Sequence, residues 1–134
     1  MSVFLDTNVI VSAMATRGLC ADVLRDVLVR HLLIIFEGLL GEVKRVLLGK
    51  LGVPPDIIAD VIALLRDGTV MGLPVPSGEL PISNSVDRAL LSAAINSKAN
   101  LFVTEDGALL ALTEYRPMNI ISPRMFWELA RSKR

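Results

Sequence analysis

Residues 3–10 are Val3-Phe4-Leu5-Asp6-Thr7-Asn8-Val9-Ile10, and the predicted architecture starts from them. Its apolar start does not alternate with polar residues, which is typical of a strand buried on both faces of a parallel sheet. Asp6 then stands at the carboxyl end of that strand, where open α/β sheets bind their ligands. Because an unpaired carboxylate is costly to bury, Asp6 is either a site residue or the cap of the following helix.

A second stretch, Asn100-Leu101-Phe102-Val103-Thr104-Glu105-Asp106, has the same order of residue types. An apolar run leads into a polar turn, an acid and then a helical pattern. The carboxyl ends of parallel strands meet at one edge of the sheet, so Asp6 and Asp106 are expected to lie close together. Two carboxylates at one edge suggest a metal or phosphate site.

The rest of the chain alternates between helical and strand patterns. Helices are predicted over residues 9–14, 21–30, 39–51, 56–66, 86–96, 108–113 and 124–131. Strands are predicted over residues 3–5, 32–36, 69–75, 100–104 and 118–122, with a loop over 76–85. Prolines and a glycine weaken the 69–75 strand and favour an edge position for it. This order predicts an α/β fold, a three-layer α/β/α sandwich with a central, mostly parallel sheet and right-handed crossovers.

The bulk composition indicates a single domain over residues 1–134, since 134 residues with 52% hydrophobic side chains can bury a substantial core. No apolar run approaches the roughly 20 residues that span a bilayer, and no basic n-region precedes an apolar core that would signal export. Cys20 is the single cysteine, which fits a reducing cytoplasm. We expect its thiol to be structural and half-buried.

The net charge is zero, with 14 basic and 14 acidic residues, which is not typical of a general nucleic-acid binder. The basic residues are nevertheless concentrated near the C-terminus. They form either a solvated helix end, favoured by the helix dipole, or a patch that contacts phosphates. These residues are Arg116, Arg124, Arg131, Lys133 and Arg134.

Two further acids are predicted to face the sheet. Glu42 lies three residues after Leu39 and four before Val46, at the flank of a buried stripe. Asp87 lies in a first helical turn, with apolar residues three, four and seven positions later. The simpler interpretations are an exposed Glu42 and an Asp87 that satisfies the helix dipole, and the residues alone leave both open.

Asp6, Glu42, Asp87 and Asp106 are thus all expected at the same edge of the sheet. Carboxylates brought together repel one another unless a cation neutralises them. Oxygen ligands favour Mg²⁺ or Mn²⁺, and the sequence has no Cys or His cluster that would favour zinc. One such ion, or two ions roughly 4 Å apart, can activate water and stabilise an in-line phosphoryl displacement.

These residues resemble a known family. The order of Leu5-Asp6-Thr7-Asn8-Val9, Glu42 in a Leu/Val-rich helix, Asp87 before Leu-Leu-Ser-Ala-Ala, and Val103-Thr104-Glu105-Asp106 is similar to PIN-domain nucleases. The similarity is to the small, single-domain PIN proteins grouped with VapC-like toxin components. It extends from Val3 to the closing Phe126-Trp127 helix.

The resemblance implies a metal-dependent endoribonuclease, the toxin of a toxin–antitoxin pair, with Asp6, Glu42, Asp87 and Asp106 as its catalytic and metal-binding cluster. Asn8 and Thr104 match the polar residues around that cluster. Glu105 adds a carboxylate where a small or basic residue is common, and it could compete with Asp106 as a ligand. A homodimer and a small antitoxin protein are the implied partners, with RNA as the substrate.

Other functions fit the residues less well. A phosphoacceptor domain needs a Lys at the end of a late strand, and the 118–122 strand supplies none. A phosphatase of the two-aspartate type needs Asp where Asn8 stands. The stronger alternative is a PIN-fold module with little catalytic activity that binds protein or RNA without cleaving it.

Overall fold

The computed structural model describes residues 1–35, 37–66, 70–71, 91, 94–95, 98–115 and 118–132. The strands are β1 (Ser2–Leu5), β2 (Leu32–Ile35), β3 (Val70–Met71), β4 (Leu101–Val103), β5 (Glu114–Tyr115) and β6 (Met118–Ile121). The helices whose bounds lie within the described residues are α1 (Thr7–Ala15), α2 (Leu19–Arg30), α3 (Glu37–Gly49), α4 (Pro55–Arg66), α6 (Gly107–Leu110) and α7 (Pro123–Ser132). Strands and helices alternate along the chain, as predicted.

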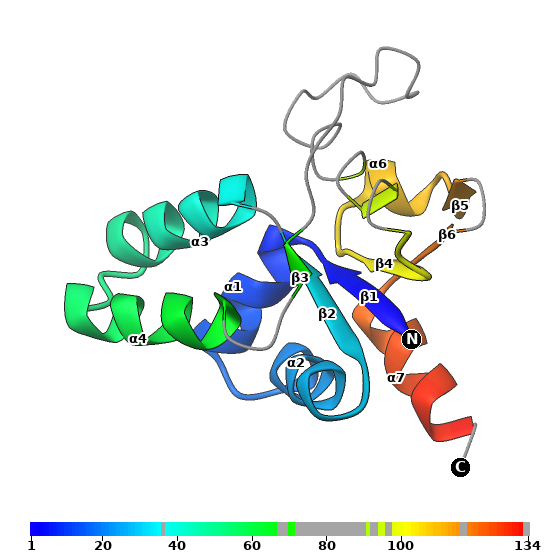
Figure 1. The fold of residues 1–134 in the computed structure, drawn as a ribbon, viewed down its shortest axis with the longest axis horizontal. Coiled ribbons are helices and arrows are strands. Elements are labelled where there is room, and N and C mark those ends of the chain that lie inside the picture. The colour runs from blue at the N-terminus through cyan, green and yellow to red at the C-terminus, as the bar shows by residue number, and fades with distance from the viewer. Residues whose placement is uncertain are drawn as a thin grey trace.

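The strands form one sheet in the order β3-β2-β1-β4-β6-β5. β1, β2, β3, β4 and β6 pair in parallel, and β5 pairs antiparallel with β6 at one edge. Figure 1 shows β1 and β2 in the middle of the molecule, with α3 and α4 at one end and α6 and α7 at the other. The predicted α/β class and mostly parallel sheet are confirmed, and the arrangement is consistent with an α/β/α sandwich.

β1 is buried as the opening stretch predicts. Val3, Phe4 and Leu5 are completely buried, and the Phe4 ring stacks on the Phe102 ring of β4 with centroids 5.1 Å apart. Leu5 pairs in register with Val103, so the residues that follow these two strands leave the sheet side by side. The pairing continues one step further, because the backbone N–H of Asp6 donates to the Val103 carbonyl over 2.9 Å.

The structure corrects several predicted boundaries. The 39–51 helix ends at Gly49, before a turn in which Gly52 has a φ of +63°. The 108–113 helix is only the short α6, because Thr113 takes a φ of +57° and the chain then forms β5, which was not predicted. β3 lies at a sheet edge as expected, although only Val70–Met71 of its predicted range is described as strand.

Part of the predicted structure lies outside the described residues. This part includes the 76–85 loop and most of the 86–96 helix with Asp87. Leu91, Ala94 and Ile95 are helical as predicted, and the first two are completely buried. In the part of the chain that the structure describes, no helix has both the length and the apolar character needed to cross a bilayer.

Candidate functional site

Asp6 caps α1 at the carboxyl end of β1. The residue is 4% exposed, and its backbone is extended, with φ −67° and ψ 158°. Its Oδ1 atom accepts a hydrogen bond from the Thr7 backbone nitrogen over 2.7 Å, which satisfies one of the unpaired donors at the helix start. The capping interpretation of Asp6 is therefore correct, and the cap brings the carboxylate to the edge where a ligand site was predicted.

Thr104 connects Asp6 to Asp106. The Thr104 side chain is completely buried, and its Oγ1 atom donates to Oδ2 of Asp6 over 2.6 Å. The same oxygen accepts from the backbone nitrogen of Asp106 over 3.0 Å. One hydroxyl thus fixes the orientation of the first carboxylate and the backbone position of the second acid, as expected if the two strand ends form one site.

Asp106 is half-buried and caps the short α6. Its Oδ1 atom accepts from the backbone nitrogens of Ala108 and Leu109, over 2.8 and 3.2 Å. No hydrogen bond to Oδ2 of Asp106 is formed by the described residues. Asn8 adds a parallel connection between the two loops, since its Oδ1 atom lies 3.4 Å from the Glu105 backbone nitrogen that donates to it.

Among the described residues, the Glu105 side chain makes no hydrogen bond to Asp6, Thr104 or Asp106. Its Oε1 atom accepts from Ser12 Oγ of α1 over 3.5 Å and from Cys20 Sγ of α2 over 3.8 Å. The side chain is exposed and held against these two helices. These contacts pack the β4–α6 turn onto α1 and α2. The role of Glu105 as an additional metal ligand stays a prediction.

Cys20 is half-buried, as predicted. Burial, and after it the charge and hydrogen bond of Glu105, together raise the pKa of its thiol from 9.0 to about 11. Since the thiolate is the nucleophile and the metal ligand, a thiol with this pKa is inert at neutral pH. The structure therefore supports a packing role for Cys20.

Of the four predicted acids, the described residues show two joined in one network. Asp6 and Asp106 are joined through Thr104, Glu42 is half-buried on α3, and Asp87 lies outside the described residues. Among the residues that the structure describes, no group of three or more His, Cys, Asp or Glu side chains is placed to hold a metal ion. The donors present at this edge are oxygens, the kind that Mg²⁺ and Mn²⁺ prefer, but the described residues do not supply a complete ligand set.

Three residues near this edge were not predicted as part of it. Thr7 is buried, and its Oγ1 atom has no hydrogen-bond partner among the described residues. Ser12 lies four residues after Asn8, so the helical repeat could have placed both on the face of α1 that meets Glu105. Nothing in the sequence indicated that Cys20 would contact Glu105, because that contact depends on how α2 packs.

The C-terminal basic residues are only partly described. The guanidinium of Arg131 lies 4.2 Å from the centre of the Trp127 ring, one turn earlier in α7. This cation–π contact gives Arg131 a structural role at the end of the helix. Arg116, Lys133 and Arg134 lie outside the described residues, so the phosphate-contact patch stays a prediction.

A scan against protein-family models finds no match for this chain, and a search of curated proteins finds no significant relative. The observations that bear on function are the chemistry of the sheet edge and the residue pattern that leads to it.

Proposed function

We propose that this chain is a PIN-domain endoribonuclease that hydrolyses RNA phosphodiesters with Mg²⁺ or Mn²⁺. The observation that supports this proposal is the hydrogen-bonded network of Asp6, Thr104 and Asp106, which joins two acids that follow neighbouring strands, at the end of the strands where open α/β sheets bind their ligands. Both acids are also helix caps, but capping alone does not require a shared, completely buried hydroxyl between them.

Each residue has a separate task in the proposed site. Asp6 and Asp106 would hold the metal ion, with Glu42 and Asp87 as the further ligands predicted from the sequence. When bound, the ion would activate water and stabilise the oxygens of the displacement. Thr104 keeps the Asp6 carboxylate in one orientation, and Asn8 holds the turn before Asp106 against α1. Preorganisation of this kind reduces the cost of assembling the ligands.

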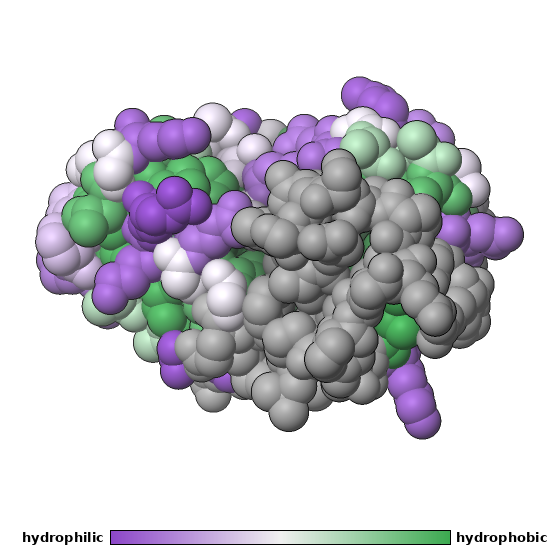
Figure 2. All heavy atoms as spheres, turned by 90° about the horizontal axis from the view of Figure 1, so that it is seen from above, coloured by the Kyte–Doolittle hydropathy of each residue, from purple (hydrophilic) through white to green (hydrophobic). Residues whose placement is uncertain are grey.

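A macromolecular partner is part of the proposal, because α3 and α4 carry an apolar groove. The groove has a volume of about 600 Å³, with apolar walls and the basic side chains of Lys44 and Arg66 among its lining. Leu48 of this lining is itself exposed, further exposed apolar side chains lie elsewhere on this part of the chain, and Figure 2 shows green areas at the side of α3 and α4. These exposed residues include Leu48, Leu51, Ile57 and Leu64. A second copy of the chain or a small antitoxin protein would cover this apolar surface, as the toxin–antitoxin proposal requires.

A cytoplasmic location also belongs to the proposal. The single cysteine, Cys20, cannot form a disulfide within the chain, and its thiol is kept protonated. A reducing compartment suits such a protein, and RNA is available there.

The proposal is tested by incubating the protein with structured and single-stranded RNA in Mg²⁺ or Mn²⁺, and then in EDTA. We expect cleavage with either metal, loss of cleavage in EDTA, and loss of cleavage in Asp6→Asn. Asp60→Asn, at an exposed position of α4, is the matched control and should cleave as the unmodified protein does.

The alternative function is a PIN-fold module that binds protein or RNA without cleaving, and the apolar α3–α4 groove is the observation that favours it. RNA that is bound but left intact by the unmodified protein would support this alternative. Equal cleavage by the unmodified protein and Asp6→Asn would instead rule out the proposed metal site as the source of activity.

A further inference from the structure

One exposed face of α4 has an acid at its start, two alanines in its middle and a base at its end. Asp56 precedes Ala59 by three residues, and Ala63 precedes Arg66 by three. In a helix, residues three and four positions apart lie on the same face, so these four side chains form one row. All four residues are exposed in the structure, as a row on an outer face requires.

This row borders the apolar groove between α3 and α4. Ala59, Ala63 and Arg66 line the groove, whose volume is about 600 Å³. Ile62 of α4 and Leu48 of α3 add apolar lining, and Leu48 is 50% exposed. Packed helix axes lie about 8–10 Å apart, depending on the side chains at the contact, so alanines in the middle of α4 let a second helix approach closely. The face therefore favours another helix as its occupant.

The charges on this face indicate which helix fits. Asp56 lies in the first turn of α4 and Arg66 in the last, where the helix dipole favours an acid and a base. The spacing along the row is three, four and three residues, so turning the helix end for end exchanges the two charges with each other and the two alanines with each other. A second α4 that lies antiparallel on the first thus places an acid opposite a base at both ends of the contact.

We propose that α4 is the contact between two copies of this chain, packed antiparallel about a two-fold axis between Ala59 and Ala63. Asp56 of each copy pairs with Arg66 of the other, and the exposed Leu48 adds apolar area from α3. Each copy uses the same patch, so the assembly closes at two copies. The proposal rests on the partner named in the proposed function, since it selects the second copy over the antitoxin, and it does not depend on RNA cleavage.

Sedimentation equilibrium of the full chain tests the contact without RNA or metal. We expect a reversible monomer–dimer equilibrium that weakens as the salt concentration rises, because exposed ion pairs are screened. Asp56→Lys and Arg66→Glu each turn two weak attractions into repulsions, so each should raise the Kd of the dimer roughly tenfold. Asp22→Lys, which reverses a first-turn acid of α2, is the matched control and should leave the Kd unchanged.

Mixing the two charge variants tests the antiparallel register. In a dimer of Asp56→Lys with Arg66→Glu, the two new side chains face each other at one end and the two original ones at the other. An equimolar mixture should therefore regain the Kd of the unmodified chain. Ala63→Arg places a long, charged side chain in the middle of the contact, so it should leave only monomer, with an unchanged circular dichroism spectrum because Ala63 is exposed.

The outcomes separate this contact from the proposed nuclease site. A chain that sediments as a monomer at every concentration would overturn the proposal and leave a different protein as the occupant of the groove. Single charge variants that dimerise as the unmodified chain does, a mixture that stays as weak as its components, or a dimer that survives Ala63→Arg would also overturn it. If Arg66→Glu does not fold, Asp56→Lys and Ala63→Arg still decide. A failure to cleave RNA would count against the metal site alone.

Discussion

Thr104 is the residue on which the proposed site depends most. Its hydroxyl is the only group in the described network that contacts both acids. Replacing Thr104 by Val keeps the shape of the side chain but removes the donor to Asp6 Oδ2 and the acceptor of the Asp106 backbone nitrogen. We expect the free energy of unfolding to fall by about 1–3 kcal/mol, because buried polar atoms lose hydrogen bonds. Urea denaturation measures the change.

Thr104→Ser is the matched control, since it keeps the hydroxyl and removes only a methyl group. We expect it to retain most of the stability that Thr104→Val loses. If Val and Ser at this position lowered stability equally, packing and not hydrogen bonding would explain why Thr104 is buried here.

The effect of Glu105 on the Cys20 thiol gives a second test that concerns single residues. Burial first, and the neighbouring Glu105 charge second, raise the Cys20 pKa to about 11. Glu105→Gln removes the charge, so the pKa should fall and the thiolate fraction at pH 9 should rise. We expect alkylation by iodoacetamide at pH 9 to become severalfold faster, because only the thiolate reacts.

Ser12→Ala should change the Cys20 pKa in the opposite direction to Glu105→Gln. Hydrogen bonding by Ser12 lowers the Cys20 pKa, so its removal should raise the pKa and slow alkylation. In the unmodified protein the rate should still be rising with pH between 9 and 11. A rate that levels off below pH 9 would contradict the raised pKa.

Among the helices and strands, those that could be predicted have a residue pattern that lies within the element itself. β1 could be predicted because a short apolar run followed by Asp6 matches a buried strand and a helix cap, and α7 because its apolar residues follow the helical repeat. β5 could not be predicted, since it consists of two residues and depends on the positive φ of Thr113 and on pairing with β6. Tertiary pairing determines such short edge strands more than intrinsic preference does.

The residues of the candidate site also divide into those that could be placed from the sequence and those that could not. Asp6 and Asp106 could be placed together because parallel strands end at a common edge, and the structure brings them within one hydroxyl of each other. The side chain of Glu105 could not be placed, because its direction depends on contacts with Ser12 and Cys20 from other elements. The role of Glu105 as a possible extra ligand beside Asp106 stays a prediction.

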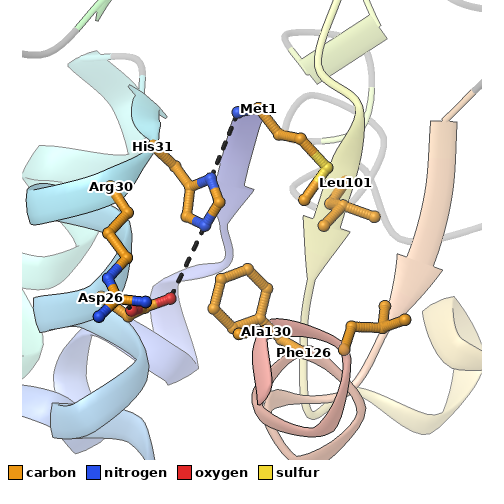
Figure 3. A pocket seen from close by; sticks show the side chains of 8 residues that line it. Met1, Asp26, Arg30, His31, Leu101, Phe126 and Ala130 are labelled. Atoms are coloured by element: carbon orange, nitrogen blue, oxygen red, sulfur yellow. Dashed lines mark hydrogen bonds and ion pairs between the residues drawn. The ribbon is translucent and has the colours of Figure 1, made fainter. Parts of the chain in front are cut away.

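At the scale of the whole molecule, β1 connects two features of opposite chemistry. Its carboxyl end leads to the acids, and its amino end borders an apolar cavity of about 180 Å³ between α2 and α7, which Phe126 and Ala130 line (Figure 3). A metal ion at the acids and a second copy at α4 each bind only the folded chain, so each should increase the stability of the entire domain by mass action. The two effects can be distinguished, because the first depends on the metal concentration and the second on the protein concentration.

Mn²⁺ should raise the melting temperature of the unmodified protein, because the ion neutralises carboxylates that the fold brings together. At a metal concentration about a hundredfold above the dissociation constant, the gain would be about 2.7 kcal/mol. Asp6→Asn should lose this gain while its metal-free stability stays within about 1 kcal/mol, since the amide oxygen can still cap α1. Ala130→Leu, which alters only the distant cavity, should keep the full response. Differential scanning calorimetry with and without Mn²⁺ measures all three proteins, and a melting temperature of the unmodified protein that does not change with Mn²⁺ would contradict the metal site.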